Sequence, residues 1–319
     1  MNNVLKQHPS TGLPALSGVI AVLFAAILWG TTGTSASFTT GVSPLAIGAV
    51  AMGGGGLLQA LLAMKSIIRQ RRQLLRYPGY LLSGALSVAL YPLAFYSSMA
   101  YAGIATGTVV AIGSAPLLTA VIEYLTEKQP LSRQWALGAG LGIAGITLLS
   151  LSEGQVSTGT ASVHFYTGIA LALVAGLTYA LYSWSARQLM QQQIPSAAAM
   201  GATFGGGALL LAPVLWVTGA PLLATPLNLA VAAYMVLIPM FLGYFCYGFG
   251  LSRIRASTAI TLTLAEPLVA ALLAVLLVGE PLTLVAGCGI GLIILCLLVT
   301  SLPARVFRRR PTVADTATG

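Results

Sequence analysis

The chain has 319 residues, of which 57% are hydrophobic and only 7% are charged. A water-soluble domain carries about 25% charged residues, so this composition excludes an ordinary soluble enzyme or binding domain. The formal net charge of +9 is compatible with a nucleic-acid partner or with membrane topology, and the positions of the basic residues favour topology.

Apolar runs of about 20 residues follow one another along the chain, and that length crosses about 30 Å of hydrocarbon as an α-helix. We expect helices because each backbone amide in lipid has to be satisfied within its own segment. A β-barrel strand would alternate apolar and polar residues, and these runs do not. The sequence predicts an all-α membrane protein with ten transmembrane helices, at 16–38, 45–67, 79–101, 104–126, 135–152, 165–187, 196–218, 228–251, 256–279 and 283–302.

The basic residues predict an orientation for these ten spans. With the N-terminus in the cytoplasm, all fifteen Lys and Arg residues fall on or beside cytoplasmic segments, and the opposite loops contain none. This is the positive-inside pattern. It predicts a multi-pass protein of the bacterial inner (plasma) membrane with both termini in the cytoplasm and no nucleic-acid partner. The stretch from Lys65 to Arg76 could also touch anionic membrane lipid.

The chain matches itself when it is shifted by 151 positions. Pro116 then falls on Pro267, and Pro130 falls on Pro281. Because each half holds five spans, an odd number, the second half enters the membrane from the opposite side. We therefore expect two inverted five-helix repeats at 16–152 and 165–302, a periplasmic connector at 153–164, and cytoplasmic tails at 1–15 and 303–319.

Short motifs stand in a fixed order along the chain, at Trp29-Gly30, Ser43-Pro44, 266–271 and 279–282. Together with the repeat, they resemble the EamA branch of the drug/metabolite transporter superfamily over residues 16–302. The resemblance implies ten helices around a central cavity, with the fifth and tenth helices packed at the side. It also implies a secondary transporter, often an exporter of amino acids or related metabolites. One position departs from the pattern, because many relatives carry an arginine where this chain has Ala51.

Glu266 is the first candidate for a functional residue. It lies about ten residues into the ninth span, which places it about 15 Å deep in the bilayer. An ionisable side chain there usually faces the bundle interior or a wet cavity. Burial favours the protonated carboxyl, so Glu266 could carry a coupling proton or pair with a substrate amine. Alternatively, it stays neutral and caps backbone groups that Pro267 leaves free.

Two prolines and a set of aromatic residues are further candidates. Pro116 and Pro267 occupy equivalent positions in the two halves, and matched helix breaks mark the central site of repeat transporters; a static kink is the alternative. Midspan aromatic rings suit a pocket for an organic substrate, although packing alone would also explain them. These aromatic candidates are Trp29, Tyr91, Phe95, Tyr96, Tyr179, Tyr244 and Tyr247.

The remaining acidic residues and the cysteines receive other interpretations. Glu123 and Glu127 share a helix face beside Lys128, which predicts an ion pair at the cytoplasmic entrance. Glu280 is expected to cap a helix at the outer surface. The three cysteines all lie in apolar runs and are interpreted as packing residues. The sequence contains no metal-ligand spacing and no Walker A motif, so we expect no metal and no cofactor.

These patterns predict a secondary transporter that moves small organic metabolites by alternating access. The resemblance to the EamA branch implies export of amino acids or related compounds as the expected activity. A proton is the possible coupling partner, and the oligomeric state is a monomer or a homodimer. The main alternative is an efflux carrier for lipophilic toxic compounds. A passive channel and a membrane-embedded enzyme are less favoured, the enzyme because the chain has only two His and six acidic residues.

Two engineered cysteines test the ten-span topology. In a background without the native cysteines, we expect Thr158→Cys to react with a membrane-impermeant maleimide in intact cells. Gln192→Cys is expected to react only after the cells are permeabilised, because the predicted topology places it in the cytoplasm. Reaction of both residues from the same face would contradict the topology.

Overall fold

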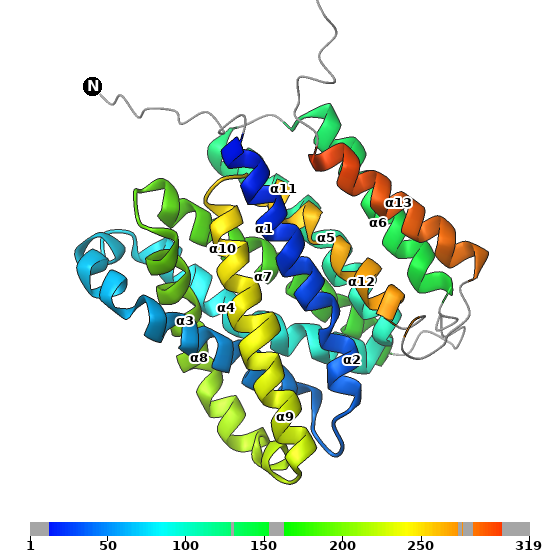
Figure 1. Ribbon diagram of the computed structural model, residues 1–319, viewed down its shortest axis with the longest axis horizontal. Coiled ribbons are helices and arrows are strands. Elements are labelled where there is room, and N and C mark those ends of the chain that lie inside the picture. The colour runs from blue at the N-terminus through cyan, green and yellow to red at the C-terminus, as the bar shows by residue number, and fades with distance from the viewer. Residues whose placement is uncertain (1–12, 129–130, 153–162, 274–275, 277–282, 302–319) are drawn as a thin grey trace, which may run out of the picture.

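The computed structural model describes residues 13–128, 131–152, 163–273, 276 and 283–301, and every regular element in these ranges is helical (Figure 1). Nine of the described spans are long and apolar enough to cross a bilayer. Together with α6 (Arg133–Ser152), a 20-residue helix, they form the ten transmembrane helices that the sequence predicts. Large apolar side chains cover the outside of this bundle, and Trp216, for example, is 89% exposed. Such a surface is suited to lipid and not to water.

The first half starts with a broken span, in which α1 (Leu13–Gly30) is followed by the short helix α2 (Thr32–Ser37). Proline and capping residues then set the helix starts, as at Ser43, whose side chain accepts a hydrogen bond from the backbone N–H of Ala46. Gly103 has a φ of +88° and allows the abrupt turn between the third and fourth spans. The other helices of this half are α3 (Pro44–Leu74), α4 (Pro78–Ala102), α5 (Ile104–Glu127) and α6.

The second half contains two interrupted spans. The eighth span is α9 (Pro226–Met235), the π-helical segment η2 (Val236–Gly243) and α10 (Tyr244–Leu251). The ninth span is α11 (Ala256–Leu262) and α12 (Ala265–Leu273), separated by two residues. The remaining elements are α7 (Val163–Gln191), α8 (Ser196–Thr218), the 3-10 turn η1 (Ala220–Leu223) and α13 (Leu284–Ser301).

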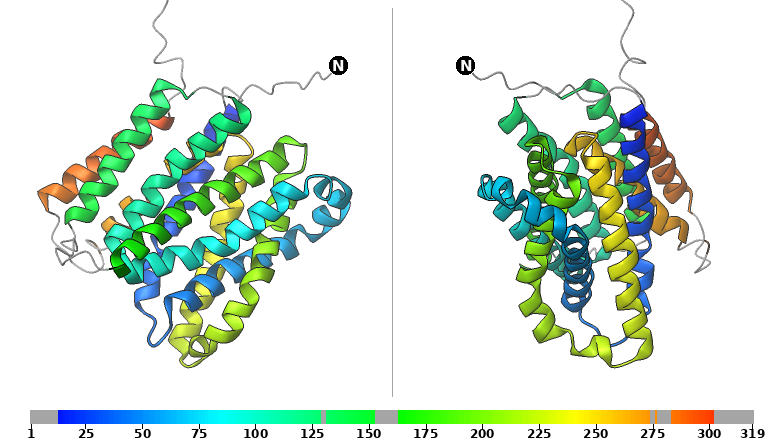
Figure 2. Two further views of the ribbon diagram at one scale, coloured as in Figure 1. Left: turned by 180° about the vertical axis from the view of Figure 1, so that it is seen from behind. Right: turned by 60° about the vertical axis from the view of Figure 1, so that its left-hand side comes forward.

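The packing groups the helices differently from the sequence halves, because each half exchanges its first helix with the other. Helix α7 lies between α4 and α5 of the first half, as Figure 2 (left) shows. Helix α1 lies between α10 and α12 of the second half (Figure 1). We call α4, α5 and α7 the first bundle, and α1, η2, α10, α11 and α12 the second bundle. Helices α3 and α8 pack on each other and on both bundles.

Helices α6 and α13, the fifth and tenth spans, pack against each other at the side of the molecule (Figure 1). Glycines make this close approach possible. A Cβ added at Gly145 would come within 2.8 Å of the Gly289 carbonyl oxygen, and one at Gly138 would meet the Thr300 hydroxyl. Small residues at helix contacts are the usual way for membrane helices to gain van der Waals contact.

Most of the described basic residues lie at one set of helix ends. Arg71 and Arg72 occupy the last turn of α3, Lys128 follows α5, and Arg255 precedes α11. Because consecutive spans cross the bundle in alternating directions, these helix ends lie on the same side. We call this side the basic side; it is the side that the charge pattern predicts to face the cytoplasm.

Gly56 tests how closely α3 and α8 have to approach. A Cβ at Gly56 would lie 2.5 Å from the Phe204 carbonyl oxygen, whereas one at Gly53 would meet Leu211 at an ordinary 3.6 Å. We expect Gly56→Ala to lower the free energy of unfolding by about 1–3 kcal/mol, in spite of the better helix propensity of alanine.

Gly53→Ala, in the same glycine run, is the matched control and is expected to leave stability unchanged or slightly higher. Thermal unfolding of the detergent-solubilised variants measures both effects. Equal melting temperatures for the two variants would contradict the close contact at Gly56.

Candidate substrate site

A cavity lies between the two bundles and against α3. Its empty space measures about 470 Å³, with the solvent at its mouth included. The lining residues are Trp29, Thr32, Gly48, Ala51, Met52, Tyr91, Pro92, Phe95, Tyr96, Tyr179, Met240, Tyr244 and Glu266.

Glu266 lies in this cavity at the break of the ninth span. Helix α11 ends at Leu262 and α12 starts at Ala265, so Glu266 is in the first turn of α12. Its backbone N–H donates to the Thr263 carbonyl oxygen at 2.9 Å. The half-buried carboxylate makes no hydrogen bond or ion pair with any residue that the structure describes. A carboxylate in this position is available to a ligand.

The two candidate prolines lie in different environments. Pro267 is in the first turn of α12, where the missing N–H leaves no helix hydrogen bond unmade. Pro116 lies inside α5, which continues without interruption from Ile104 to Glu127. The break in the ninth span therefore has no counterpart at the equivalent place in the first half.

The π-helical segment η2 contributes a second irregularity to the cavity wall, and the sequence analysis did not identify it. Its carbonyl groups accept side-chain donors, with Trp29 Nε1 donating to the Pro239 oxygen at 2.9 Å and Gln59 Nε2 donating to the Met240 oxygen at 3.4 Å. Pro239, in the middle of an apolar run, was the only sequence signal for this π-helical segment. π-Helical turns often occur at functional sites.

Most of the predicted aromatic residues already have hydrogen-bond partners in the protein. The hydroxyls of Tyr182 and Tyr244 share a hydrogen bond of 2.9 Å, and Tyr179 shares one of 2.8 Å with the Thr263 hydroxyl. The hydroxyl of Tyr247, which is buried behind the cavity wall, donates to Ser183 Oγ at 2.9 Å. These tyrosines hold the bundles together, and Tyr179 and Tyr244 also present ring surface to the cavity.

Tyr91 and Tyr96 differ from the other tyrosines of the cavity. Their hydroxyls have no hydrogen-bond partner among the described residues, and both side chains line the same cavity as Glu266. Tyr91 stacks on Phe95 with ring centroids 5.6 Å apart and an interplanar angle of 18°. The cavity thus offers a substrate one carboxylate, two hydroxyls and several aromatic faces.

Helix α3 supplies lining residues that the sequence analysis did not select. Gly48 lets Tyr96 lie directly against the helix, because a Cβ there would be 2.7 Å from the Tyr96 ring. Ala51 is 1% exposed and lines the same cavity as Glu266. An arginine at position 51, as in the resembling family, would therefore line the same cavity as Glu266. Its absence leaves Glu266 without a cationic neighbour in the described cavity lining.

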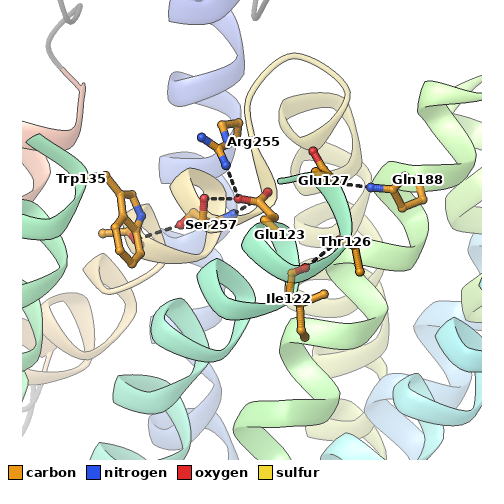
Figure 3. A network of polar contacts seen from close by, with 9 residues as sticks. Ile122, Glu123, Thr126, Glu127, Trp135, Gln188, Arg255 and Ser257 are labelled. Atoms are coloured by element: carbon orange, nitrogen blue, oxygen red, sulfur yellow. Dashed lines mark hydrogen bonds and ion pairs between the residues drawn. The ribbon is translucent and has the colours of Figure 1, made fainter. Parts of the chain in front are cut away.

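The predicted ion pair of Glu123 is present, but its basic partner is Arg255 and not the neighbouring Lys128. The Glu123 carboxylate is fully buried and lies 3.2 Å from the Arg255 guanidinium (Figure 3). Lys128 is exposed and ends α5 in the left-handed conformation. Helical spacing identifies local neighbours, and here a tertiary partner from the other bundle takes their place. Glu280 lies outside the described residues, and within the described residues no cluster of metal-ligating side chains occurs.

Comparison with known proteins agrees with this architecture. The sequence model of the EamA-like transporter family matches the chain twice, at residues 16–151 and 166–302. The uncharacterized transporter YwfM of Bacillus subtilis is 36% identical over 287 residues, which cover 89% of this chain and 93% of YwfM. The threonine/homoserine exporter RhtA of Escherichia coli K12 is 27% identical over 190 residues, which cover 58% of this chain and 59% of RhtA.

A solved crystal structure has the same fold, with a TM-score of 0.76 and 20% sequence identity over 92% of this chain and 99% of that chain. Ten membrane-spanning helices in two repeats, with a cavity at a helix break between the two bundles, are the architecture of a membrane transporter. The chain belongs to the EamA-like transporter family and is a multi-pass membrane transporter.

The two classes of tyrosine lead to a stability prediction. Tyr182→Phe leaves the buried Tyr244 hydroxyl without its partner, and we expect the free energy of unfolding to fall by about 1–3 kcal/mol. Tyr91→Phe removes a hydroxyl that bonds no described residue, so stability is expected to stay unchanged. Thermal unfolding of the two purified variants measures the difference in stability. A larger loss of stability for Tyr91→Phe would contradict the distinction between tyrosine hydroxyls with and without a hydrogen-bond partner.

Proposed function

We propose that this transporter exports small polar metabolites, with amino acids as the first candidate substrates, across the bacterial inner membrane by alternating access. The substrate occupies the cavity between the two bundles, and relative movement of the bundles opens the cavity to one side at a time. The termini and the basic side face the cytoplasm. The transporter works as a monomer or homodimer, with membrane lipid and a coupling proton as further partners.

The observation that carries this proposal is the chemistry of the cavity. Glu266 offers a carboxylate without a partner among the described residues to a substrate amine, and the hydroxyls of Tyr91 and Tyr96 are available to a substrate carboxylate. An amino acid carries both of these groups. The similarity to RhtA over 190 residues supports the same class of substrate.

A second candidate function is efflux of lipophilic toxic compounds. The aromatic faces of Trp29, Tyr91, Phe95 and Tyr244 in the cavity favour it, because such rings bind apolar and cationic compounds without needing hydrogen bonds. Growth of an expressing strain under a panel of toxic compounds, compared with release of amino acids into the medium, separates the two functions.

Flux measurements on the purified protein identify the substrate. Vesicles that contain the transporter are loaded with a mixed pool of metabolites, and mass spectrometry follows which compounds leave and which enter. We expect selective, saturable movement of one or a few amino acids. If only lipophilic compounds move across the vesicle membrane, the proposed export of amino acids is wrong and efflux of lipophilic compounds takes its place.

Glu266→Gln tests coupling to protons. If the carboxyl carries the coupling proton, the net flux of the variant no longer responds to a pH gradient. Loss of the carboxylate also weakens binding of the substrate amine, so flux is compared at saturating substrate. Glu153→Gln, at the start of the predicted periplasmic connector, is the matched control and is expected to keep the response. Gradient-driven flux of the Glu266→Gln variant at the parent rate would remove the proton-coupling role.

A further inference from the structure

Polar contacts between the two bundles gather on one side of the cavity. The hydroxyl pairs Tyr179–Thr263 and Tyr182–Tyr244 border the cavity itself. Beyond them, toward the basic side, Tyr247 donates to Ser183, and Arg187 Nη1 donates to the Leu251 carbonyl oxygen at 2.6 Å. Among the described residues, the polar contacts that join the bundles lie between the cavity and the basic side. The path from the cavity to the basic side is therefore closed.

The contact nearest the basic side is an ion pair that joins the bundles (Figure 3). Glu123 belongs to α5 of the first bundle, and Arg255 and Ser257 belong to the start of α11 in the second. Arg255 Nη2 lies 3.2 Å from Glu123 Oε2, and Ser257 Oγ donates to the same oxygen at 2.5 Å. The Glu123 side chain is 0% exposed and that of Arg255 is 23% exposed.

The surroundings of this pair are polar as well. Glu127 Oε1 accepts a hydrogen bond of 2.7 Å from Gln188 Nε2 of α7 (Figure 3). The buried Nε atoms of Arg187 and Arg255 have no hydrogen-bond acceptor among the described residues. Two carboxylates and two guanidinium groups gather here, and ionisable groups within membrane spans usually pair with one another and face the bundle interior or a water-filled cavity.

A line of buried polar side chains connects the ion pair with the cavity. On α11 and the break that follows it, Ser257, Thr261 and Thr263 are each at most 2% exposed. Trp135 Nε1 donates to the Thr261 hydroxyl at 3.1 Å, and Thr263 bonds Tyr179 beside the cavity. Apolar side chains would pack as well against a permanently closed interface, so hydroxyls on this face point to a passage.

The opposite side of the protein has no equivalent charges in its sequence. Under the 151-residue repeat, Glu123 corresponds to Ala274 and Arg255 corresponds to Ile104. In an inverted repeat, these uncharged counterparts belong to the other end of the passage. The sequence therefore gives the two ends different chemistry, and only the basic side has an ion pair at this position.

We propose that the substrate crosses the basic half of the protein between α5, α7 and α11, and that the Glu123–Arg255 pair is the lock that closes this passage. Opening has to separate the two charges, which lie in different bundles. This inference uses the membership in a transporter family and holds for any transported compound. Its test needs no substrate, so its failure is distinguishable from failure of the proposed function.

The test measures access of a thiol reagent to Thr261→Cys, in full-length protein without the native cysteines. A membrane-impermeant maleimide is added from the basic side, in inside-out vesicles. The lock is removed in the double variant Glu123→Gln/Arg255→Gln, which removes both charges of the pair together. We expect the labelling rate at Thr261→Cys to rise at least tenfold in this variant.

Thr203→Cys, also 0% exposed but on α8, is the matched control and is expected to label at an unchanged rate. An unchanged rate at Thr261→Cys overturns the proposal, as does faster labelling from the opposite side of the membrane. An equal rise at both cysteines shows that the pair stabilises the whole fold and also overturns it as a lock.

Discussion

The backbone inside a bilayer has no water to bond, so every break in a helix needs a replacement partner. This protein has breaks at Thr31, within η2 and at Thr263–Leu264, and each is compensated locally. The Thr31 hydroxyl donates to the Leu28 carbonyl oxygen, and the Trp29 indole N–H donates to the Pro239 carbonyl oxygen. The Glu266 backbone N–H donates to the Thr263 carbonyl oxygen. Residues at or next to all three breaks line the cavity. In the part of the chain that the structure describes, the helix breaks within the spans therefore lie beside the cavity.

Span length and charge were sufficient to predict the ten helices and the gathering of basic residues at one set of helix ends, because hydrocarbon thickness and ionisation act on each segment separately. The pairing of Glu123 with Arg255 could not be predicted, since it depends on tertiary packing between segments 132 positions apart (123 to 255). The same holds for the tyrosines. Periodicity places Tyr91 and Tyr182 in spans of similar character, and only the fold shows that Tyr182 bonds Tyr244 whereas Tyr91 faces the cavity.

The two repeats are related but unequal. Helix α5 continues through Pro116, whereas its counterpart is divided into α11 and α12 before Pro267. Helix α7 is one helix of 29 residues, whereas its counterpart is interrupted after α1. The breaks thus gather in the second bundle, and the first bundle consists of continuous helices. The helix interruptions of the described residues therefore border the cavity on the side of the second bundle.

The exchange of first helices has a consequence for biosynthesis. Trp29 and its acceptor Pro239 are separated by 210 positions, which a ribosome needs about 10–40 s to translate at 5–20 residues per second. During that interval α1 resides in the bilayer without its final neighbours, and its indole N–H has only transient partners. The nascent first half therefore cannot reach its mature packing by itself. Assembly waits for the last third of the polypeptide, and insertion factors have time to act on α1 before it docks.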